Sequence, residues 1–596
     1  MTATVAIVGG ALRGTSMLER IGDAVGRYGG PAVHTVVIDP HPPGPGAVWR
    51  TDQSPLLLMN TPAAASTLWP DDADRGLSFW QWLNSEAVDP ALRASADGAT
   101  PQSFLPRALH GHYLRWAYRR IVADLPAAVS HEWRRDEVVD MQRSGAGFTL
   151  SLASGATPVR AEAVVLATGW SDDVRPVRPD GRARCIDAGS PIRQDLDAIA
   201  PGEHVLAVGM GLNFFDAVTL LTAGRGGTFD EDDSGELVYR PSGAEPVIVA
   251  TSRRGFPYRS RLRGAEAPHT SLKCFVRSGD SRPIDFTAEL LPRIVHDANA
   301  EYYRALAEQR PDAVTVGAGD FIDAFTRWAP GAEAFDAFLE HAVPQRINRF
   351  DARSLLEPVA AMWTTPARFR SAVLAALRRD IEAAVAEVEC PERVATRSFC
   401  EARRVLVPII RYGALRTLDD YQRYADEVSF LSNGPPVRRL RELVALLEAG
   451  VVDVLGPMPV ESIRHGGLVV SSAQVADSAR PFTVRLEARV PKPSVHGGDR
   501  LTSALRRSGL VRAWRETSDA VDTDRDTGAV LGPDGAVVPG LYAAGLLTWD
   551  YRLHSLMAPV PGSDSPFFHE TTCIADSLVA HLRSADVRPD ESPTKG

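Results

Sequence analysis

The chain has 596 residues, a formal net charge of −10, 44% hydrophobic residues and 23% charged residues. This length exceeds what one hydrophobic core supports, so we expect two or three domains of ordinary globular composition. The acidic balance argues against nucleic acid as the main partner, and no apolar run approaches the ~20 residues that span a bilayer. Because the first strand begins almost at Met1, we expect no signal peptide, no membrane partner and a cytoplasmic location.

The opening residues read as a strand that runs into a glycine-rich turn and then a helix. Thr4–Gly14 reads Thr-Val-Ala-Ile-Val-Gly-Gly-Ala-Leu-Arg-Gly. This order is typical of the first part of a dinucleotide-binding βαβ unit, in which the helix N-terminus receives the diphosphate. An ordinary strand–turn–helix that needs small residues for packing is the alternative. The positions expected to contact the cofactor are Gly9, Gly10, Ala11, Arg13 and Gly14, with Ala11 in place of the usual middle glycine.

A second strand, His34–Asp39, ends in an acid placed to bind ribose hydroxyls. The Pro/Gly-rich segment Asp39–Arg50, which includes Trp49, follows where a cofactor's sugar and diphosphate would lie. A helix is predicted over His110–Val122, and a later strand ends in Ala167-Thr168-Gly169. Many flavoproteins with two dinucleotide sites turn between domains at such a tripeptide.

A second strand–glycine–helix unit begins at His204 and contains Gly209, Gly211 and Asn213. Phe214 occupies the third glycine position, so the helix must start differently or stand further from the sheet. The next strand ends in Ser252-Arg253-Arg254 rather than in an acid, which favours the 2′-phosphate of NADPH over NADH. The alternative is that the two arginines simply lie in water.

Residues 282–450 carry amphipathic runs, among them Phe369–Val388 and Val437–Leu447, and predict a mostly helical insertion. Near the C-terminus Gly540–Gly545 reads as a strand that returns to a small-residue turn. No acid follows Gly545, although Asp550 or Asp564 could substitute, and Phe567 leads into a helix expected at Thr571–Leu582. Two dinucleotide units in one chain usually serve FAD at the first and a nicotinamide dinucleotide at the second. The expected domains are therefore residues 1–200 (FAD, N-terminal part), 201–281 (NADP), 282–450 (helical), 451–585 (return to both) and 586–596 (polar tail).

Several stretches resemble the FAD/NAD(P)-binding protein family of actinobacterial type, which is similar in layout to class B flavin monooxygenases, especially amino-acid N-oxygenases of the nitrosuccinate-forming type. The matching stretches are Val8–Gly14, Asp39–Trp49, Phe104–Leu114, Leu221–Phe229, Tyr239–Tyr258 and Gly540–Gly545. The resemblance implies an α/β fold with two Rossmann-like domains, for FAD and NADP, and a helical insertion. It also places Met59, Asn60 and Val138 at the cofactor and matches the family's next segment to Pro106-Arg107 and His112-Tyr113.

The spacing of the cysteines limits which reactions the sequence supports. Cys185, Cys274, Cys390, Cys400 and Cys573 form no C-x-x-C pair and show no metal-ligand spacing, so we expect no zinc site, and the disulfide-reductase route is closed. The remaining expectation is a monooxygenase that uses FAD, NADPH and O₂ on a small amine or amino acid, with aspartate leading, in small-molecule biosynthesis. A flavin amine oxidase or dehydrogenase, or a non-catalytic flavin-binding protein, stays open.

No residue of the sequence is assigned a catalytic role. The substrate pocket is expected between the FAD domain and the helical insertion, where several cations would suit a substrate carboxylate. A solvated surface charge is the alternative for each of them. The candidates are Lys273, Arg261, Asn433 and Arg438, with Arg259 and Arg263 nearby, and a homo-oligomer is possible.

Overall fold

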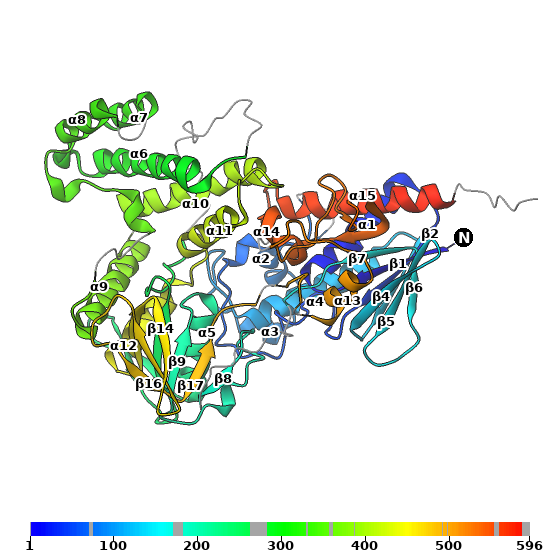
Figure 1. The fold of residues 1–596 in the computed structure, drawn as a ribbon, viewed down its shortest axis with the longest axis horizontal. Coiled ribbons are helices and arrows are strands. Elements are labelled where there is room, and N and C mark those ends of the chain that lie inside the picture. Colours follow the sequence, from blue (N-terminus) through cyan, green and yellow to red (C-terminus); the bar gives the residue numbers. More distant parts are fainter. Residues whose placement is uncertain are drawn as a thin grey trace, which may run out of the picture. The chain divides into compact units, whose positions relative to one another are not determined.

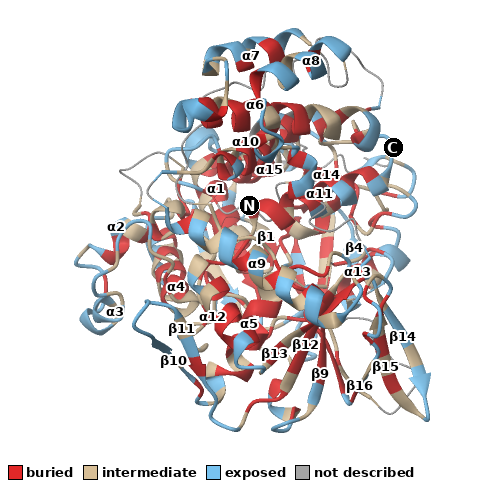
Figure 2. Cartoon of the chain, turned by 90° about the vertical axis from the view of Figure 1, so that its left-hand side faces the viewer, coloured by how far each residue is buried: buried red, intermediate tan, exposed pale blue. Residues whose placement is uncertain are grey.

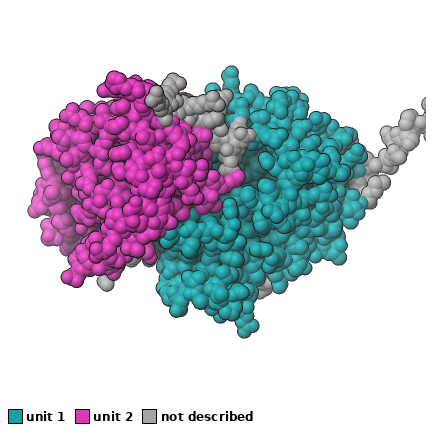
Figure 3. Space-filling view, turned by 90° about the horizontal axis from the view of Figure 1, so that it is seen from below, with its two compact units in different colours: residues 1–175, 491–596 teal, residues 176–490 magenta. Residues whose placement is uncertain are grey.

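The structure, a computed structural model, describes residues 2–70, 76–170, 183–262, 283–328, 332–356, 362–386, 388–491, 493–497, 499–553 and 559–586. The chain forms two compact units, coloured separately in Figure 3: residues 1–175 with 491–596, and residues 176–490. Strand β8 (Arg184–Ile186) already pairs in the sheet of the second unit, so the first segment of unit 1 ends before the boundary expected at residue 200.

Unit 1 is built on a six-stranded sheet with the order β18-β19-β7-β1-β2-β3, of which Figure 1 labels β7, β1 and β2. All neighbours are parallel except β18, which runs antiparallel to β19. The parallel strands therefore end at one edge, where doubly wound sheets bind ligands. The strands are β1 (Thr2–Val8), β2 (Ala32–Ile38), β3 (Val129–Arg134), β7 (Ala163–Leu166), β18 (Ala529–Leu531) and β19 (Val537–Ala543).

The two faces of this sheet carry separate cores, because side chains alternate along each strand. In β1, Val5 and Ile7 join the core formed with α1, α4 and α15, while Ala6 and Val8 join the core formed with α13 and an antiparallel sheet. The helices of unit 1 are α1 (Leu12–Tyr28), α2 (Phe79–Leu83), α3 (Pro90–Ala94), α4 (Arg107–Ala123), α13 (Arg500–Arg507), α14 (Trp549–Arg552) and α15 (Pro566–Asp586), and the antiparallel strands are β4 (Val138–Ser144), β5 (Gly147–Leu152) and β6 (Val159–Ala161).

Unit 2 repeats this plan around a parallel five-stranded sheet with the order β13-β12-β9-β17-β8. Val205 and Ala207 of β9 pack with α5, α9 and α12, whereas Leu206 and Val208 pack with the antiparallel strands β15 and β16. The elements are β9 (His204–Val208), β12 (Val247–Ser252), β13 (Val452–Pro457), β17 (Val484–Glu487), β14 (Pro459–Arg464), β15 (Gly467–Ser472), β16 (Arg480–Phe482), α5 (Leu212–Leu221), α9 (Pro366–Val385) and α12 (Val437–Glu448).

The hairpin and the helical part complete unit 2. Strands β10 (Thr228–Glu231) and β11 (Leu237–Arg240) form the hairpin that lengthens the spacing between Gly209 and Arg253. The structure confirms the predicted helical portion. Figure 2 shows that β9 and β12 carry buried residues, whereas α7 and α8 carry many exposed ones. The helices are α6 (Leu291–Gln309), α7 (Ala318–Arg327), α8 (Glu333–Ala342), α10 (Pro391–Ile410) and α11 (Leu418–Ser432). Over the described ranges, no helix has the length and apolar character that a membrane crossing requires.

Candidate functional site

The first glycine turn lies tightly against the strand edge. Gly9 has a φ of +99°, its N–H donates to the carbonyl of Ile38 at 2.9 Å, and a Cβ there would lie 2.6 Å from the carbonyl oxygen of Ala167. Helix α1 begins at Leu12, and its N-cap residue Ala11 makes no side-chain hydrogen bond to it. The N-cap residue therefore provides no side-chain cap for the first turn of α1, which suits a site that receives a diphosphate.

Asp39 holds this turn. One carboxylate oxygen accepts the N–H of Gly10 at 2.7 Å, and the other accepts the N–H of His41 at 2.7 Å. Burial raises the pKa of the Asp39 carboxyl, and these two hydrogen bonds partly oppose the shift. Each oxygen keeps lone-pair capacity for a further donor. Binding of ribose hydroxyls by Asp39 therefore remains a prediction compatible with its contacts.

The Pro/Gly-rich loop folds back over the turn. The N–H of Gly44 donates to the carbonyl of Gly10 at 2.8 Å, and a Cβ on Gly46 would lie 2.5 Å from the Cβ of Ala11. The methyl of Ala11 is thus already covered by this chain's own loop. Further along, the ring of Trp49 packs edge-on against His110 at 4.5 Å between centroids.

The Met59-Asn60 segment, which the resemblance places near the flavin, lies beside the Pro106-Arg107 segment that follows it in the family pattern. The N–H of Met59 donates to the carbonyl of Leu105 at 2.9 Å, and the N–H of Arg107 donates to the carbonyl of Leu57 at 2.8 Å. Met59 is buried, and Asn60 next to it is partly exposed. Val138, by contrast, packs its side chain into the core on the β4–β6 face of the sheet, so the side chain itself is occupied.

The return strand β19 brings the Gly545 turn to the same sheet edge as the Gly9 turn. The N–H of Ala544 donates to the carbonyl of Leu166 at 2.9 Å, and β7 lies between β19 and β1. Thr168 and Gly169 follow β7 at this edge, and a Cβ on Gly169 would meet no atom within 4 Å. The three carboxyl ends thus form the candidate FAD site of unit 1.

An acid does reach the Gly545 turn, but it is neither of the two expected substitutes. Asp550 accepts from the hydroxyl of Ser518 at 2.8 Å, and the exposed Asp564 pairs with His569 at 2.5 Å. Instead Glu570 accepts the N–H of Gly545 at 3.5 Å. The sequence contained no signal for Glu570, because it lies on the following helix and α15 begins earlier than predicted.

The second glycine turn repeats the backbone pattern of the first. Gly209 has a φ of +111°, and its N–H donates to the carbonyl of Thr251 at 2.8 Å. Helix α5 begins at Leu212 directly after Gly211, which provides no side-chain cap, so the expectation of a different helix start is wrong. Phe214 turns into the core at 1% exposure.

Further contacts fix the other predicted nicotinamide-site residues of unit 2. The amide of Asn213 donates to the carbonyl of Gly189 at 2.8 Å, and the hydroxyl of Ser252 accepts the N–H of Gly255 at 2.9 Å. These contacts tie the edge of the sheet to its flanking loops. Both residues therefore lie near the carboxyl ends of β9 and β12, and their contact with a nicotinamide dinucleotide stays a prediction.

The two arginines after β12 differ in their surroundings. The Arg253 side chain is 60% exposed and pairs with Asp426 at 3.2 Å. Arg254 is largely buried, forms an ion pair with Glu427 at 2.5 Å and lies over the ring of Phe430 at 4.7 Å. Burial raises the pKa of the Glu427 carboxyl, although Arg254 opposes that shift. Arg253 is thus the accessible cation, and Arg254 is a structural one.

The structure brings two of the predicted substrate residues together. The backbone N–H of Arg261 donates to the carbonyl of Pro435 at 2.8 Å, and its guanidinium donates to the carbonyl of Ser432, next to Asn433 at the end of α11. Burial lowers the pKa of Arg261. Arg438, in contrast, is 71% exposed and pairs with Glu442 at 2.9 Å. Lys273 and Arg263 lie outside the described residues.

Further arginines lie near Arg261, and of these the sequence singled out only Arg259. Arg393 donates to the hydroxyl of Ser260 at 2.9 Å and to Asp380 at 3.2 Å. Burial lowers the pKa of Arg259, and Asp380 partly compensates. The Nε of Arg403, a neighbour of Arg261, is buried without a hydrogen-bond partner in the described part of the chain. Arg259, Arg261, Arg393 and Arg403 are called the arginine cluster below.

No group of three or more His, Cys, Asp or Glu side chains in the described ranges is arranged to hold a metal ion. The arrangement in each unit is instead that of a dinucleotide site. In unit 1 it comprises the turns after β1, β7 and β19, and in unit 2 the turns after β9 and β12.

Comparison with known proteins agrees with this arrangement. The model of an FAD-NAD(P)-binding family matches residues 6–171. The nitrosuccinic acid synthase npaA of Aspergillus oryzae is 33% identical, over 97% of this chain and 93% of its own length. An L-aspartate N-monooxygenase (nitrosuccinate-forming) of Streptomyces cremeus is 32% identical, over 98% of this chain and 96% of its own length. An ornithine hydroxylase structure from Pseudomonas aeruginosa is similar at 10% identity and a TM-score of 0.45, covering 98% of this chain and 100% of that one.

The fold and these relatives define a flavin-dependent N-monooxygenase that binds FAD and a nicotinamide dinucleotide and uses O₂. The chain belongs to the family that contains the Aspergillus oryzae and Streptomyces cremeus enzymes. The predicted family, fold class and enzyme class are thereby confirmed.

Proposed function

We propose that the protein N-oxygenates L-aspartate to nitrosuccinate, with NADPH as the electron donor, in small-molecule biosynthesis. Two relatives above 30% identity over nearly the whole chain support it: one is named a nitrosuccinic acid synthase and the other a nitrosuccinate-forming L-aspartate N-monooxygenase. The structural observation that carries the proposal is the arginine cluster. A group of largely desolvated guanidiniums, one with a buried Nε that has no hydrogen-bond partner among the described residues, suits an acidic substrate, because desolvated charges require counter-charges and guanidinium binds carboxylate with matched geometry.

FAD fits the edge of unit 1. We assign the diphosphate to the Gly9–Gly14 turn and the uncapped start of α1, and the ribose to Asp39. When bound, FAD takes electrons from the reduced nicotinamide and passes them to O₂. The proposed FAD-contacting residues are Gly9, Gly10, Ala11, Arg13, Gly14, Asp39, Trp49, Met59, Asn60, Val138 (through its backbone), Thr168, Gly169, Gly545 and Phe567.

NADPH is assigned to unit 2, at the turns after β9 and β12. The uncapped start of α5 after Gly211 is suited to the diphosphate. Arg253 is the cation assigned to the 2′-phosphate, because its guanidinium is accessible while Arg254 is held by Glu427 and Phe430. Gly209, Asn213 and Ser252 complete the proposed site.

The arginine cluster would also favour the reactive form of the substrate. An amine must lose its proton before its nitrogen can accept oxygen, and nearby cations disfavour the ammonium form. Guanidiniums that hold the carboxylates would therefore lower the pKa of the substrate amino group. Arg261 and Asn433 are the proposed binding residues. Arg438 is the weakest of the earlier candidates because its side chain is mostly exposed.

The test is a comparison of amino acids as effectors of NADPH consumption. Aspartate is expected to stimulate NADPH oxidation and O₂ uptake and to yield nitrosuccinate, whereas glutamate, asparagine, ornithine and lysine give only the background rate. Formation of oxaloacetate and ammonia without NADPH would instead identify an amine oxidase. A protein that binds flavin but shows no substrate-dependent O₂ uptake would also refute the proposal.

A further inference from the structure

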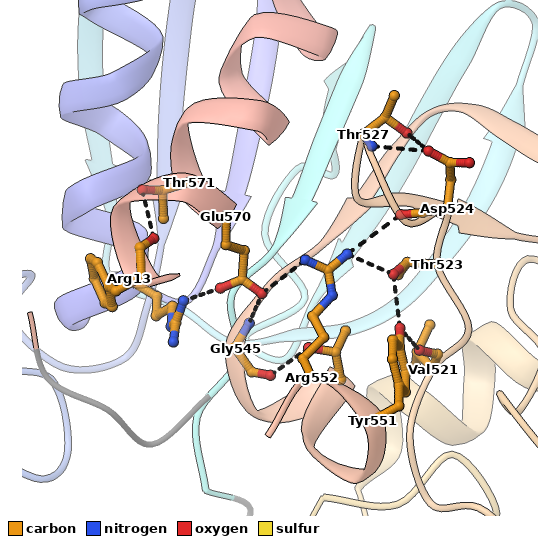
Figure 4. Close-up of polar contacts among 12 residues, drawn as sticks. Arg13, Val521, Thr523, Asp524, Thr527, Gly545, Tyr551, Arg552, Glu570 and Thr571 are labelled. Atoms are coloured by element: carbon orange, nitrogen blue, oxygen red, sulfur yellow. Dashed lines mark hydrogen bonds and ion pairs between the residues drawn. The ribbon is translucent and has the colours of Figure 1, made fainter. Parts of the chain in front are cut away.

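A buried carboxylate in unit 1 joins three groups from distant parts of the chain. Glu570 lies on the first turns of α15, and its side chain is 1% exposed. One carboxylate oxygen forms an ion pair with Arg13, while the other lies 3.3 Å from Nη1 of Arg552 and accepts the N–H of Gly545 at 3.5 Å (Figure 4). A single side chain thus contacts the start of α1 and the return turn.

Arg13 contacts the return turn as well. A Cβ on Gly545, whose φ is +75°, would lie 3.2 Å from Cδ and Nε of Arg13. The guanidinium of Arg13 lies over the ring of Phe567, 4.3 Å from its centroid. Burial lowers the pKa of Arg13, and Glu570 opposes that shift. The Gly545 turn therefore rests directly on the Arg13 side chain.

Arg552 anchors the other side of the carboxylate. Its Nη2 donates to the hydroxyl of Thr523 at 2.9 Å and to the carbonyl of Asp524 at 3.4 Å. The hydroxyls of Thr523 and Tyr551 are 2.8 Å apart, and Tyr551 donates to the carbonyl of Val521 at 2.9 Å (Figure 4). Because each member is bonded to the next, a rigid polar network holds Arg552 and, through it, Glu570.

This network connects two turns that both belong to the candidate FAD site. The Gly9–Gly14 turn follows β1 and the Gly545 turn follows β19, with β7 between them in the sheet. No hydrogen bond links β1 to β19 directly, since they are not neighbours. Beyond the strand ends, the side chains of Arg13 and Glu570 join the two turns directly.

We propose that Glu570 is a positioning residue that, through Arg13 and Arg552, fixes the return turn relative to the diphosphate-binding turn and so sets the geometry in which FAD is held. Glu570 thus brings an acid to the Gly545 turn without being the residue that grips the cofactor. The proposal rests on FAD binding by unit 1 and not on the identity of the substrate.

The experiment compares Glu570→Gln with Asp576→Asn in the full-length protein. Asp576 also joins α15 to α1, through Arg27 at 3.0 Å, but at the far end of α1 where both side chains are one-third or more exposed. Apoprotein of each variant is titrated with FAD, the dissociation constant is taken from flavin fluorescence, and the visible absorption and circular dichroism of the bound flavin are recorded. We expect E570Q to raise the FAD dissociation constant at least tenfold and to alter the flavin spectra, and D576N to stay within twofold of the parent.

A second pair of variants keeps the proposal testable if E570Q does not fold. Glu570→Asp keeps the charge with a shorter reach, and Arg552→Lys keeps the charge but loses the fork that reaches Thr523. Both are expected to weaken FAD binding and alter the flavin spectra at temperatures well below the melting point of the apoprotein. A purely structural role would lower the melting temperature and leave these spectra unchanged. FAD affinities within twofold of the parent and unchanged spectra in the folded variants would overturn the proposal, whatever the enzyme does with aspartate.

Discussion

Gly14 faces the carbonyl oxygen of Gly9 so closely that a Cβ at residue 14 would lie 1.8 Å from that oxygen. No side chain fits in this space, so the first turn of α1 approaches its strand only because residue 14 is glycine. The close approach places the start of the helix at the carboxyl end of β1.

Gly14→Ala is therefore expected to displace α1 and to abolish stoichiometric FAD binding. Gly26→Ala in the same helix is the matched control, because a Cβ there meets nothing within 4 Å. Removing a helical glycine at such a site stabilises a protein by ~0.4–1 kcal/mol, so G26A should bind FAD normally and melt slightly higher. The ratio of flavin to protein absorbance, together with the melting temperature, checks both. Normal flavin content in G14A would contradict the account of this turn.

Substitutions of Arg253 and Arg254 are expected to have different effects. Loss of Arg253 should change the preference for NADPH over NADH, and loss of Arg254 should change stability. Charge-assisted hydrogen bonds contribute ~1.5–3 kcal/mol, so Arg253→Ala should raise the KM for NADPH ~10–100-fold and leave the KM for NADH nearly unchanged. Arg254→Ala removes the partner of the buried Glu427 and should lower the melting temperature without changing the ratio of the KM values for NADPH and NADH. Steady-state kinetics with NADPH and with NADH measures these KM values. An unchanged ratio of the two KM values in R253A would reject the assignment of Arg253 to the 2′-phosphate.

His110 gives unit 1 a defined sensitivity to acid. Burial lowers its pKa from 6.5 to about 3, so the imidazole is neutral in the folded protein while the unfolded chain takes up a proton below about pH 6.5. The stability from this difference is complete above pH 6.5 and is lost as the pH falls toward 3. At pH 5 the loss is ~2 kcal/mol, from ~1.4 kcal/mol per pH unit.

The variant His110→Gln should reduce the drop in melting temperature between pH 7.5 and pH 5. The side chain would still reach toward Ser66, whose hydroxyl lies 2.9 Å from Nε2 of His110. His204→Gln, at an exposed position, is the control and should show the parental pH dependence. An identical pH dependence in the parent and H110Q would show that His110 does not contribute.

The proposed substrate site predicts different effects on the KM for aspartate when Arg261 or Arg438 of unit 2 is replaced. Arg261→Lys keeps a charge in the arginine cluster but loses the guanidinium fork, and we expect the KM for aspartate to rise about tenfold with FAD content unchanged. Arg438→Ala removes a mostly exposed side chain and should leave both values within twofold. Initial rates of aspartate-dependent NADPH oxidation give the comparison. A KM shift in R438A but not in R261K would move the site away from the cluster.

Local patterns were sufficient to predict the two glycine turns and most of the long helices. The strand–glycine–helix order at Gly9 and Gly209 is read within one βαβ unit, and the amphipathic run Val437–Leu447 matches α12 almost end to end. The last helix was predicted too short, since α15 begins at Pro566, which provides a proline in the first turn. That error placed Glu570 outside the predicted helix.

Long-range contacts could not be predicted from spacing. Arg13 and Glu570 are 557 residues apart in sequence, and nothing near either of them indicates the other. The arginine cluster is assembled from α10 and the segment around Arg261, so only the fold places Arg393 and Arg403 beside Arg261. Asp39 was recognised as the acid that ends β2, whereas its hydrogen bonds to Gly10 and His41 depend on the fold of the following loop.

The most direct test of the central claim is an isotope experiment with the purified enzyme, FAD, NADPH, ¹⁸O₂ and ¹⁵N-labelled L-aspartate. N-oxygenation by this flavoprotein predicts nitrosuccinate that retains the ¹⁵N and carries ¹⁸O on that nitrogen, formed only when NADPH is present. Release of ¹⁵N-ammonia with oxaloacetate, or NADPH oxidation that yields only hydrogen peroxide with aspartate unchanged, would contradict the account.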